Sequence, residues 1–124
     1  MVHVKCMMRL ANKAAQQSSY YYKLGAVIVK GNRVIESGYN KIGHCKINSF
    51  PNSRHAEMDV ILKVLRKENG LSSLSNSTLY VSRITAHGTA MAKPCAKCMK
   101  LIHSVGIKEV IYTTDNNLTE RLKI

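Results

Sequence analysis

Two short segments, well separated in the chain, constrain the fold more than any other feature. The first is His55-Ala56-Glu57, and the second is Pro94-Cys95-Ala96-Lys97-Cys98. One imidazole and two thiolates are ligands that zinc prefers, and three protein ligands leave a fourth position for water, as in catalytic zinc sites. The sequence therefore predicts a fold that brings both segments to one Zn2+ ion, with His55, Cys95 and Cys98 as its ligands.

The spacing within each segment fits this chemistry. Cys95 and Cys98 lie three residues apart, so they share one face of a helix, and Pro94 suits the first turn of that helix. The positive end of the helix dipole stabilises thiolates, so we expect both cysteines to lose their protons before the metal arrives. Glu57 need not be a ligand. It is placed to carry protons to and from the water on the metal, which makes it the candidate catalytic residue.

A closed structural zinc site is the main alternative from the residues alone. A Cys-x-x-Cys pair by itself is also typical of redox motifs and structural zinc knuckles. A structural site would need a fourth ligand, for which the chain offers Cys6, Cys45, His44, His87 and His103. Nothing in such a site requires Glu57 beside His55. His-x-Glu followed by Pro-Cys-x-x-Cys is the signature of zinc nucleobase deaminases, so the motif favours a hydrolase.

The chain resembles the cytidine and deoxycytidylate deaminase superfamily, which also contains tRNA adenosine deaminases. The resemblance runs from about residue 24 to residue 115 and is most specific at the metal motif. Outside that motif, the matching segments are Gly25-Ala26-Val27-Ile28-Val29, Gly38-Tyr39-Asn40, Leu79-Tyr80-Val81 and Gly106-Ile107-Lys108-Glu109-Val110-Ile111-Tyr112. It implies an α/β fold, a three-layer sandwich with helices packed on a mixed central sheet.

The resemblance also implies the reaction, hydrolytic deamination of a cytosine nucleotide or nucleoside to the uracil form with release of ammonia. Zinc-bound hydroxide would attack the base, and Glu57 would serve as the proton shuttle. By the same resemblance, Asn40 contacts the sugar, the backbone N–H of Ala56 binds the base carbonyl, and Tyr112 lies near the base. The residues alone also allow a turn asparagine, an ordinary helix former and a core aromatic at these positions.

The charge bears on the substrate. Nineteen Lys and Arg against seven Asp and Glu give a formal net charge of +12. Such a surface attracts polyanions and steers phosphorylated ligands toward a cleft. The same net charge is also typical of a soluble protein whose surface is generally basic. The charge is therefore compatible with two other functions. The first is the editing of adenosine or cytidine in tRNA or single-stranded nucleic acid, and the second is that of a zinc module that only binds nucleic acid.

Two features depart from the better-known branches of the superfamily. Deoxycytidylate deaminases more often have glycine at the position of Lys41, and residues 85–93 differ from the compact junction between the strand and the Pro-Cys segment.

Length and composition predict one domain, residues 1–124, in which 45% hydrophobic residues suffice for a single core. The first residues do not read as a signal peptide, and no stretch approaches the about 18 apolar residues of a membrane span. Four cysteines, two of them claimed by the metal motif, favour a reducing compartment. We therefore expect a cytoplasmic protein with no membrane partner. Because members of the superfamily usually self-associate, we also expect a homo-oligomer.

Hydrophobic periodicity and turn residues predict the element order α-β-β-α-β-α-β. The predicted helices span residues 4–17, 54–69 and 94–105, and the predicted strands span 25–30, 33–37, 78–84 and 108–114. Loops are expected at 40–53, 71–76 and 85–93, with Ser53 as a helix cap and Gly70 as a helix stop. Residues 119–123 are predicted as a short terminal helix.

Several further residues have two interpretations. Asp59 could orient the imidazole of His55, but an acid in the first turn of a helix is more typical of a solvated face. Cys45 with His44, or Cys6, could support a second metal, although a buried thiol and an exposed imidazole are the expectation. The run Tyr20-Tyr21-Tyr22 is expected to pack a helix end onto the sheet rather than stack on bases. His87 is expected to be an exposed loop histidine.

Overall fold

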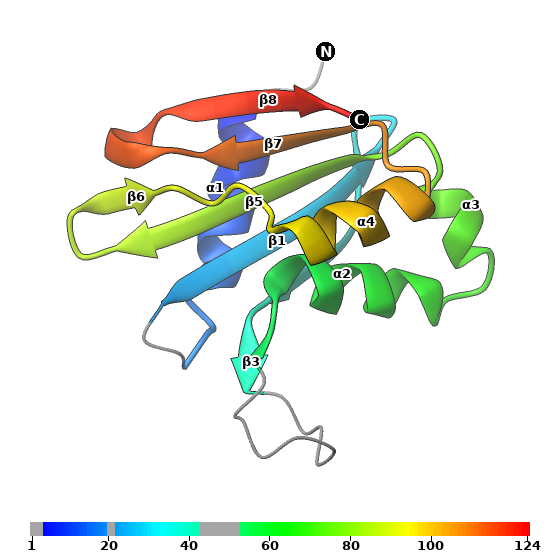
Figure 1. Cartoon of the computed structure of the whole chain (residues 1–124), viewed down its shortest axis with the longest axis horizontal. Coiled ribbons are helices and arrows are strands. Elements are labelled where there is room, and N and C mark those ends of the chain that lie inside the picture. The colour runs from blue at the N-terminus through cyan, green and yellow to red at the C-terminus, as the bar shows by residue number, and fades with distance from the viewer. Residues whose placement is uncertain (1–3, 20–21, 43–52) are drawn as a thin grey trace.

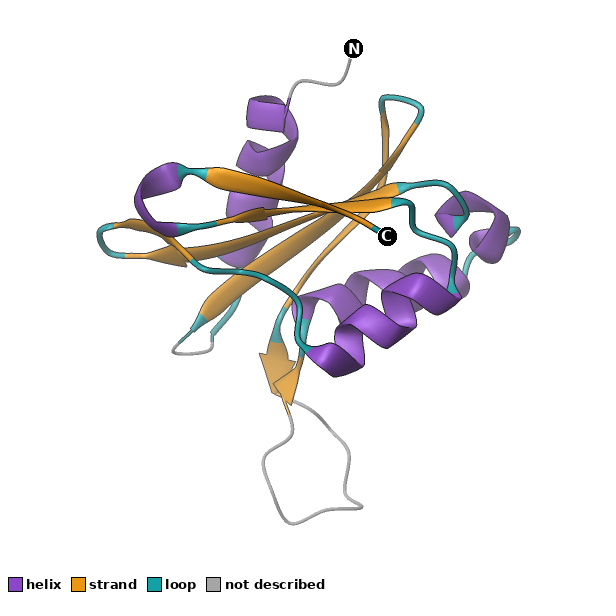
Figure 2. Ribbon diagram, turned by 45° about the horizontal axis from the view of Figure 1, so that its top comes forward, coloured by secondary structure: helices purple, strands orange, loops and turns teal. Residues whose placement is uncertain are grey.

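The computed structural model describes residues 4–19, 22–42 and 53–124. Helix α1 (Val4–Ala15) covers one face of a mixed sheet, and α2 (Ala56–Leu65) and α4 (Ala96–Ser104) cover the other (Figures 1 and 2). A short helix, α3 (Gly70–Leu74), follows α2. The predicted α/β class and its three layers are therefore confirmed. None of the helices among the described residues is long and apolar enough to cross a membrane.

The main sheet has the strand order β2-β1-β5-β7-β8, with β6 beside β5. Its strands are β1 (Lys23–Lys30), β2 (Arg33–Tyr39), β5 (Thr78–Thr85), β6 (Gly88–Ala90), β7 (Glu109–Thr113) and β8 (Thr119–Lys123). Strands β5 and β7 pair in parallel, and the other pairs are antiparallel. A separate two-stranded sheet joins β3 (Lys41–Ile42) to β4 (Ser53–Arg54).

The central strands are buried on both faces because helices lie on both sides of the sheet. On β5, Leu79 and Val81 belong to the core beneath α2 and α4, whereas Tyr80 packs with residues of α1 on the opposite side. This period of two follows from the pleat of a β-strand. Gly25 lets α1 approach β1 closely, because a Cβ there would overlap the backbone O of Ala11 and the backbone N of Ala15.

The predicted terminal helix is wrong, since residues 119–123 form strand β8, antiparallel to β7. A 3-10 turn at Asp115–Asn117, with positive φ at Asn116 and Asn117, reverses the chain between the two strands. A helix of five residues gains too few hydrogen bonds to offset its nucleation cost. Pairing with β7 instead satisfies backbone N–H and C=O groups along the edge of the sheet.

The predicted boundaries around Gly70 also need correction. The second helix ends at Leu65, before the expected residue 69, and Asn69 adopts a left-handed conformation with φ 60°. Gly70 begins α3 rather than only ending a helix, and Leu74 of α3 is fully buried. The serine-rich composition of residues 71–76 concealed this element because one buried leucine is too little for a periodic signal.

The predicted loop at residues 85–93 contains a hairpin. Strand β6 pairs with the end of β5 through a turn at Ala86 and His87, and Gly88 at the start of β6 has a φ of 122°. His87 in this turn is exposed, as expected. The hairpin brings the chain back along the sheet, so that residues 91–95 cross toward the start of α4 (Figure 1).

Candidate metal centre and active site

Two helix starts meet on one face of the sheet. His55 and Cys95 are the N-cap residues of α2 and α4, and both have extended backbone angles. Neither side chain caps its own helix. The helices therefore begin at Ala56 and Ala96, and the predicted cap at Ser53 is wrong because Ser53 lies in β4.

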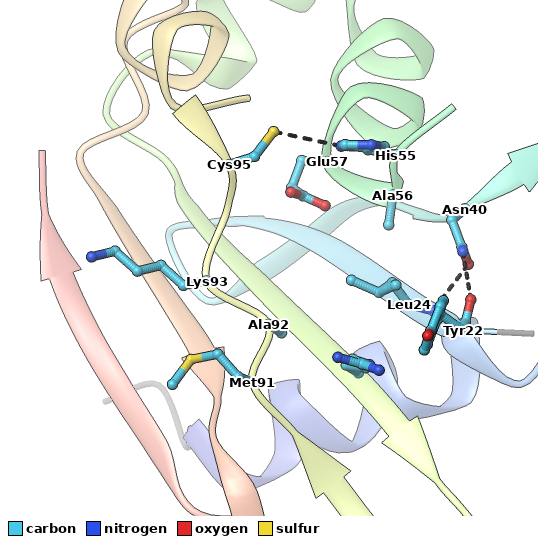
Figure 3. A pocket seen from close by; sticks show the side chains of 11 residues that line it. Tyr22, Leu24, Asn40, His55, Ala56, Glu57, Met91, Ala92, Lys93 and Cys95 are labelled. Carbon is cyan, nitrogen blue, oxygen red and sulfur yellow. Dashed lines mark hydrogen bonds between the residues drawn. The ribbon is translucent and has the colours of Figure 1, made fainter. Parts of the chain in front are cut away.

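The three predicted ligands lie together. Nδ1 of His55 is 3.7 Å from Sγ of Cys95 and 3.4 Å from Sγ of Cys98. All three ligand atoms lie within 4.8 Å of one another, and Figure 3 shows His55 and Cys95 facing each other. Cys98 joins them from the first turn of α4 because it shares a helix face with Cys95.

The cluster fits a zinc ion. With Zn–N near 2.0 Å and Zn–S near 2.3 Å, a tetrahedral ion separates a nitrogen and a sulfur ligand by about 3.5 Å. The two observed N···S distances lie on either side of this value. Within residues 4–19, 22–42 and 53–124, no other histidine, cysteine or acid joins the cluster, so Cys6, His87 and His103 are not fourth ligands. His44 and Cys45 lie outside the described residues.

Glu57 lies beside these ligands but is not part of the cluster (Figure 3). It is 3% exposed, and its Oε1 has no hydrogen-bond partner among the described residues. Burial raises the pKa of this carboxyl, and its own backbone N–H and the neighbouring His55 lower it less. A buried acceptor without a partner costs roughly 1–3 kcal/mol. Such a cost at a cavity wall is typical of a group that meets its partner only when a ligand is bound.

The expectation that the helix dipole favours deprotonation of both cysteines before the metal arrives is not supported for Cys98. Burial, followed by the nearby carboxylate of Glu57, raises the pKa of the Cys98 thiol well above its ordinary value. Desolvation of this side chain, which is 1% exposed, is the largest cause of the raised pKa. Loss of this proton is coupled to metal binding, since a coordinating thiol is deprotonated outright.

A cavity of about 400 Å³ opens above this site. The residues that line it are Tyr22, Leu24, Asn40, His55, Ala56, Glu57, Arg83, Met91, Ala92, Lys93 and Cys95. The structure thus brings Asn40, Ala56 and Glu57 to one cavity with two of the metal ligands. Ala56 is the first residue of α2, so its backbone N–H has no carbonyl partner within the helix.

Asn40 is held in place by the start of β1. Its Oδ1 accepts a hydrogen bond from the backbone N–H of Leu24 at 2.9 Å, and its Nδ2 donates to the backbone O of Tyr22 at 2.6 Å (Figure 3). An asparagine amide has two N–H donors and two acceptor lone pairs, so one of each remains for a ligand. Its position at the cavity is therefore compatible with both predicted roles, structural and substrate-binding.

Tyr112 is not brought to this cavity. It is 5% exposed within the core, and its hydroxyl donates to Oε2 of Glu120 on β8 at 2.9 Å. Core packing, one of its two interpretations, describes its surroundings, and its predicted contact with the base has no support in this geometry.

Besides Tyr22, five cavity residues were not expected from the sequence: Leu24, Arg83, Met91, Ala92 and Lys93. Arg83 follows Leu79 and Val81 on the same face of β5, so strict alternation along the predicted strand could have placed it there. Lys93 and Met91 depend on the β6 hairpin, which the sequence did not reveal. The guanidinium of Arg83 lies over the ring of Tyr22, 4.5 Å from its centre.

Two other predictions change. Tyr22 is 52% exposed at the cavity rather than packed beneath a helix end, and Tyr20 and Tyr21 lie outside the described residues. Asp59 is fully buried, so its interpretation as a solvated surface acid is wrong. Its carboxylate faces β2 and β3 instead of water.

The sequence model of the cytidine and deoxycytidylate deaminase zinc-binding region matches residues 1–114. The chain belongs to this family. It is 32% identical over 121 residues to deoxycytidylate deaminase from Schizosaccharomyces pombe, an alignment that covers 90% of this chain and 37% of that protein. It spans less than half the length of the curated relatives it matches.

Solved structures of deaminases share the fold. A cytidine deaminase from Burkholderia pseudomallei superposes with a TM-score of 0.73 at 18% identity, covering 99% of this chain and 93% of the other. The dCMP deaminase of cyanophage S-TIM5 superposes with a TM-score of 0.66 at 23% identity, covering 92% of this chain and 84% of the other. The family match and the cluster of one histidine and two cysteines agree on zinc as the metal.

Proposed function

We propose that residues 1–124 form a single deaminase domain that hydrolyses the amino group of a cytosine nucleotide or nucleoside and releases ammonia. The observation that carries this proposal is the unpartnered, buried Oε1 of Glu57 beside a three-ligand metal cluster at a cavity. The relatives support it, since one is named deoxycytidylate deaminase and another, from Drosophila melanogaster, probable deoxycytidylate deaminase, and the cyanophage enzyme has been solved in complex with dCMP and dUMP.

The metal ligands and Glu57 have separate roles in this reaction. His55, Cys95 and Cys98 would hold zinc, whose Lewis acidity makes water a nucleophile near neutral pH. Glu57 takes a proton from the attacking water and delivers one to the ring nitrogen of the base. It then takes the second proton from the hydroxyl now bonded to the ring carbon and passes it to the departing amine, so that the C–N bond breaks, the C=O bond forms, and water and cytosine become uracil and ammonia. One carboxylate thus acts as base and as acid in turn.

The cavity wall suits the rest of the substrate. The backbone N–H of Ala56 binds the base carbonyl, and the missing side chain beyond Cβ leaves room for the ring. Asn40 uses its remaining donor and acceptor for the sugar. Tyr112 has no part in this arrangement, because it lies in the core.

We further propose that the substrate is a nucleotide rather than a nucleoside. Two cations, Arg83 and Lys93, line the cavity, and Glu57 is its only carboxylate among the described lining residues. The side chain of Lys93 is exposed, and its ammonium points away from Glu57 (Figure 3). Cations at the mouth of a cavity attract a phosphate and stabilise it through charge-assisted hydrogen bonds.

Replacing Arg83 by Gln should raise KM for dCMP about 10-fold to 100-fold, since a hydrogen bond to a charged group contributes roughly 1.5–3 kcal/mol. The KM for deoxycytidine, which lacks the phosphate, should change little. Steady-state kinetics on both substrates measure the difference. Arg66→Gln removes the same charge from an exposed site at the end of α2 and should affect neither substrate. An equal loss on both substrates would mean that Arg83 only supports the cavity wall.

An ammonia-release panel on the zinc-loaded protein tests the proposed reaction. The substrates are dCMP, CMP, deoxycytidine, cytidine, AMP, adenosine and tRNA. We expect turnover of cytosine compounds, with the monophosphates preferred, and none of the adenine compounds. Turnover of tRNA alone would favour the alternative of editing within nucleic acid. Folded, zinc-replete protein that releases no ammonia from any cytosine compound would exclude the proposal. The homo-oligomeric state and the cytoplasmic location stay predictions.

A further inference from the structure

A buried ion cluster lies behind the cavity wall, centred on Asp59. Its side chain is 1% exposed, and Oδ1 lies 3.2 Å from Nζ of Lys41 while Oδ2 lies 3.6 Å from Nζ of Lys63. Oδ2 also accepts a hydrogen bond from the backbone N–H of Tyr39 at 3.2 Å. This carboxylate has no assigned part in the reaction, yet it lies on α2, two residues after Glu57.

The contacts of Asp59 fall on both sides of Asn40 in the sequence. Tyr39 and Lys41 bind the carboxylate, whereas the side chain of Asn40 between them bonds to Leu24 and Tyr22 at the cavity. In an extended chain, successive side chains point to opposite sides. The carboxylate therefore holds the backbone N–H of Tyr39 on one side of Asn40 and the side chain of Lys41 on the other, while Asn40 itself faces the cavity.

The connection from Asp59 to the metal-binding segment is short and tightly packed. The backbone N–H of Asp59 donates to the carbonyl of His55 at 2.9 Å. A Cβ at Gly38 would lie 2.7 Å from Oδ2 of Asp59 and 2.9 Å from the backbone N of Val60. Because α2 lies directly against β2 at Gly38, a shift of the Asp59 carboxylate would be transmitted to the neighbouring strand.

The charges explain why the carboxylate stays in place. Lys41 and Lys63, with side chains 34% and 32% exposed, both reach a single buried anion. Their ammonium groups also lie 4.6 and 5.8 Å from the centre of the Tyr39 ring. Removing one partner of a buried ion pair leaves uncompensated charge. Without the Asp59 charge, two ammonium groups would face each other over one ring, and the segment at Tyr39 would move.

We propose that Asp59 is a positioning residue that fixes Asn40 relative to Glu57, and so sets how tightly the substrate is bound. The proposal rests on the proposed function in one respect, the contact of Asn40 with the substrate. The other part of the proposal, that Asp59 fixes the position of Asn40, does not depend on any enzymatic activity.

The kinetic test is a double-mutant cycle with Asp59→Asn and Asn40→Ala on dCMP. Asp59→Asn should raise KM at least about 10-fold, lower kcat less than about 3-fold and leave the zinc content unchanged. In the Asn40→Ala background, Asp59→Asn should raise KM no further, because residues that act through one contact are not additive. Fully additive effects would overturn the proposal.

The matched control is Glu36→Gln. Glu36 on β2 pairs at 3.1 Å with Lys67, which follows the end of α2, so this ion pair links β2 to the segment after α2, with side chains 29% and 48% exposed. It should leave KM unchanged. If Asp59→Asn does not fold, Lys41→Met removes one of the two flanking contacts and should raise KM by a smaller factor. An unchanged KM in Lys41→Met would then contradict the proposal.

A second measurement separates this proposal from the proposed function. Hydrogen exchange of the Asn40 side-chain amide, followed by NMR in the zinc-loaded protein, should be at least about 10-fold faster in Asp59→Asn than in wild type or Glu36→Gln. This result is expected even if the substrate proves not to be a cytosine compound. Unchanged exchange at Asn40 would refute the role of Asp59, whatever the enzyme turns over.

Discussion

Replacing Glu57 by Gln is expected to lower kcat for dCMP by at least about 1,000-fold, because general acid–base catalysis contributes roughly 100- to 10,000-fold and one carboxylate performs both steps. A 1,000-fold loss corresponds to about 4 kcal/mol of transition-state stabilisation. Glutamine has nearly the same shape but neither accepts nor delivers a proton under these conditions. Initial rates of ammonia release, together with zinc content per chain, measure the effect.

The melting temperature of Glu57→Gln should show that the loss of kcat does not come from misfolding. Glu57 is 3% exposed and its Oε1 lacks a partner among the described residues, so the native side chain is kept at a cost in folding free energy. A neutral amide removes the buried charge, and the melting temperature of Glu57→Gln should equal or exceed that of wild type. Glu68→Gln makes the same chemical change at an exposed position after α2 and should alter neither rate nor melting temperature. A zinc-replete Glu57→Gln with wild-type turnover would rule out the proposed proton shuttle.

The metal cluster was predictable because its signal is local. Cys95 and Cys98 share a helix face through their spacing alone, and His55 precedes a helix that the apolar periodicity reveals. Local sequence patterns do not indicate that the two helix starts meet, because their meeting depends on the sheet that both helices cover. The ligand chemistry of the two segments and the resemblance together supplied that step, and the distances of 3.4 and 3.7 Å agree with it.

The residues that shape the cavity wall were harder to predict, because their roles depend on tertiary contacts. Asp59 looks like an ordinary acid of a first helical turn until β2 approaches at Gly38, where only a residue without a side chain fits. Arg83 is one basic residue among many in the sequence, and it becomes a cavity residue only because β5 directs it toward α2 and α4. Burial against another element overrides the local tendencies from which solvent exposure is predicted.

Cys98→Ser is expected to abolish stable zinc binding. Loss of groups that merely support a ligand lowers metal affinity about 10- to 100-fold, so loss of one of three protein ligands should exceed that range. The protein should carry far less than one equivalent of zinc and release no measurable ammonia from dCMP. Metal analysis after dialysis and the activity assay measure both effects. Cys6→Ser is the matched control, because Cys6 is an exposed thiol on α1, on the opposite face of the sheet.

The fold of Cys98→Ser distinguishes a catalytic from a structural zinc. The core beneath α2 and α4 contains buried apolar residues from β1, β5 and β7, and their burial itself stabilises the fold. Circular dichroism should therefore remain close to wild type, with a lower melting temperature because zinc stabilises only the native state that binds it. A structural site supplies folding energy outright, so its loss would unfold the chain. Unfolding of Cys98→Ser but not of Cys6→Ser would thus favour the structural site, whereas stoichiometric zinc in Cys98→Ser would remove Cys98 from the ligand set.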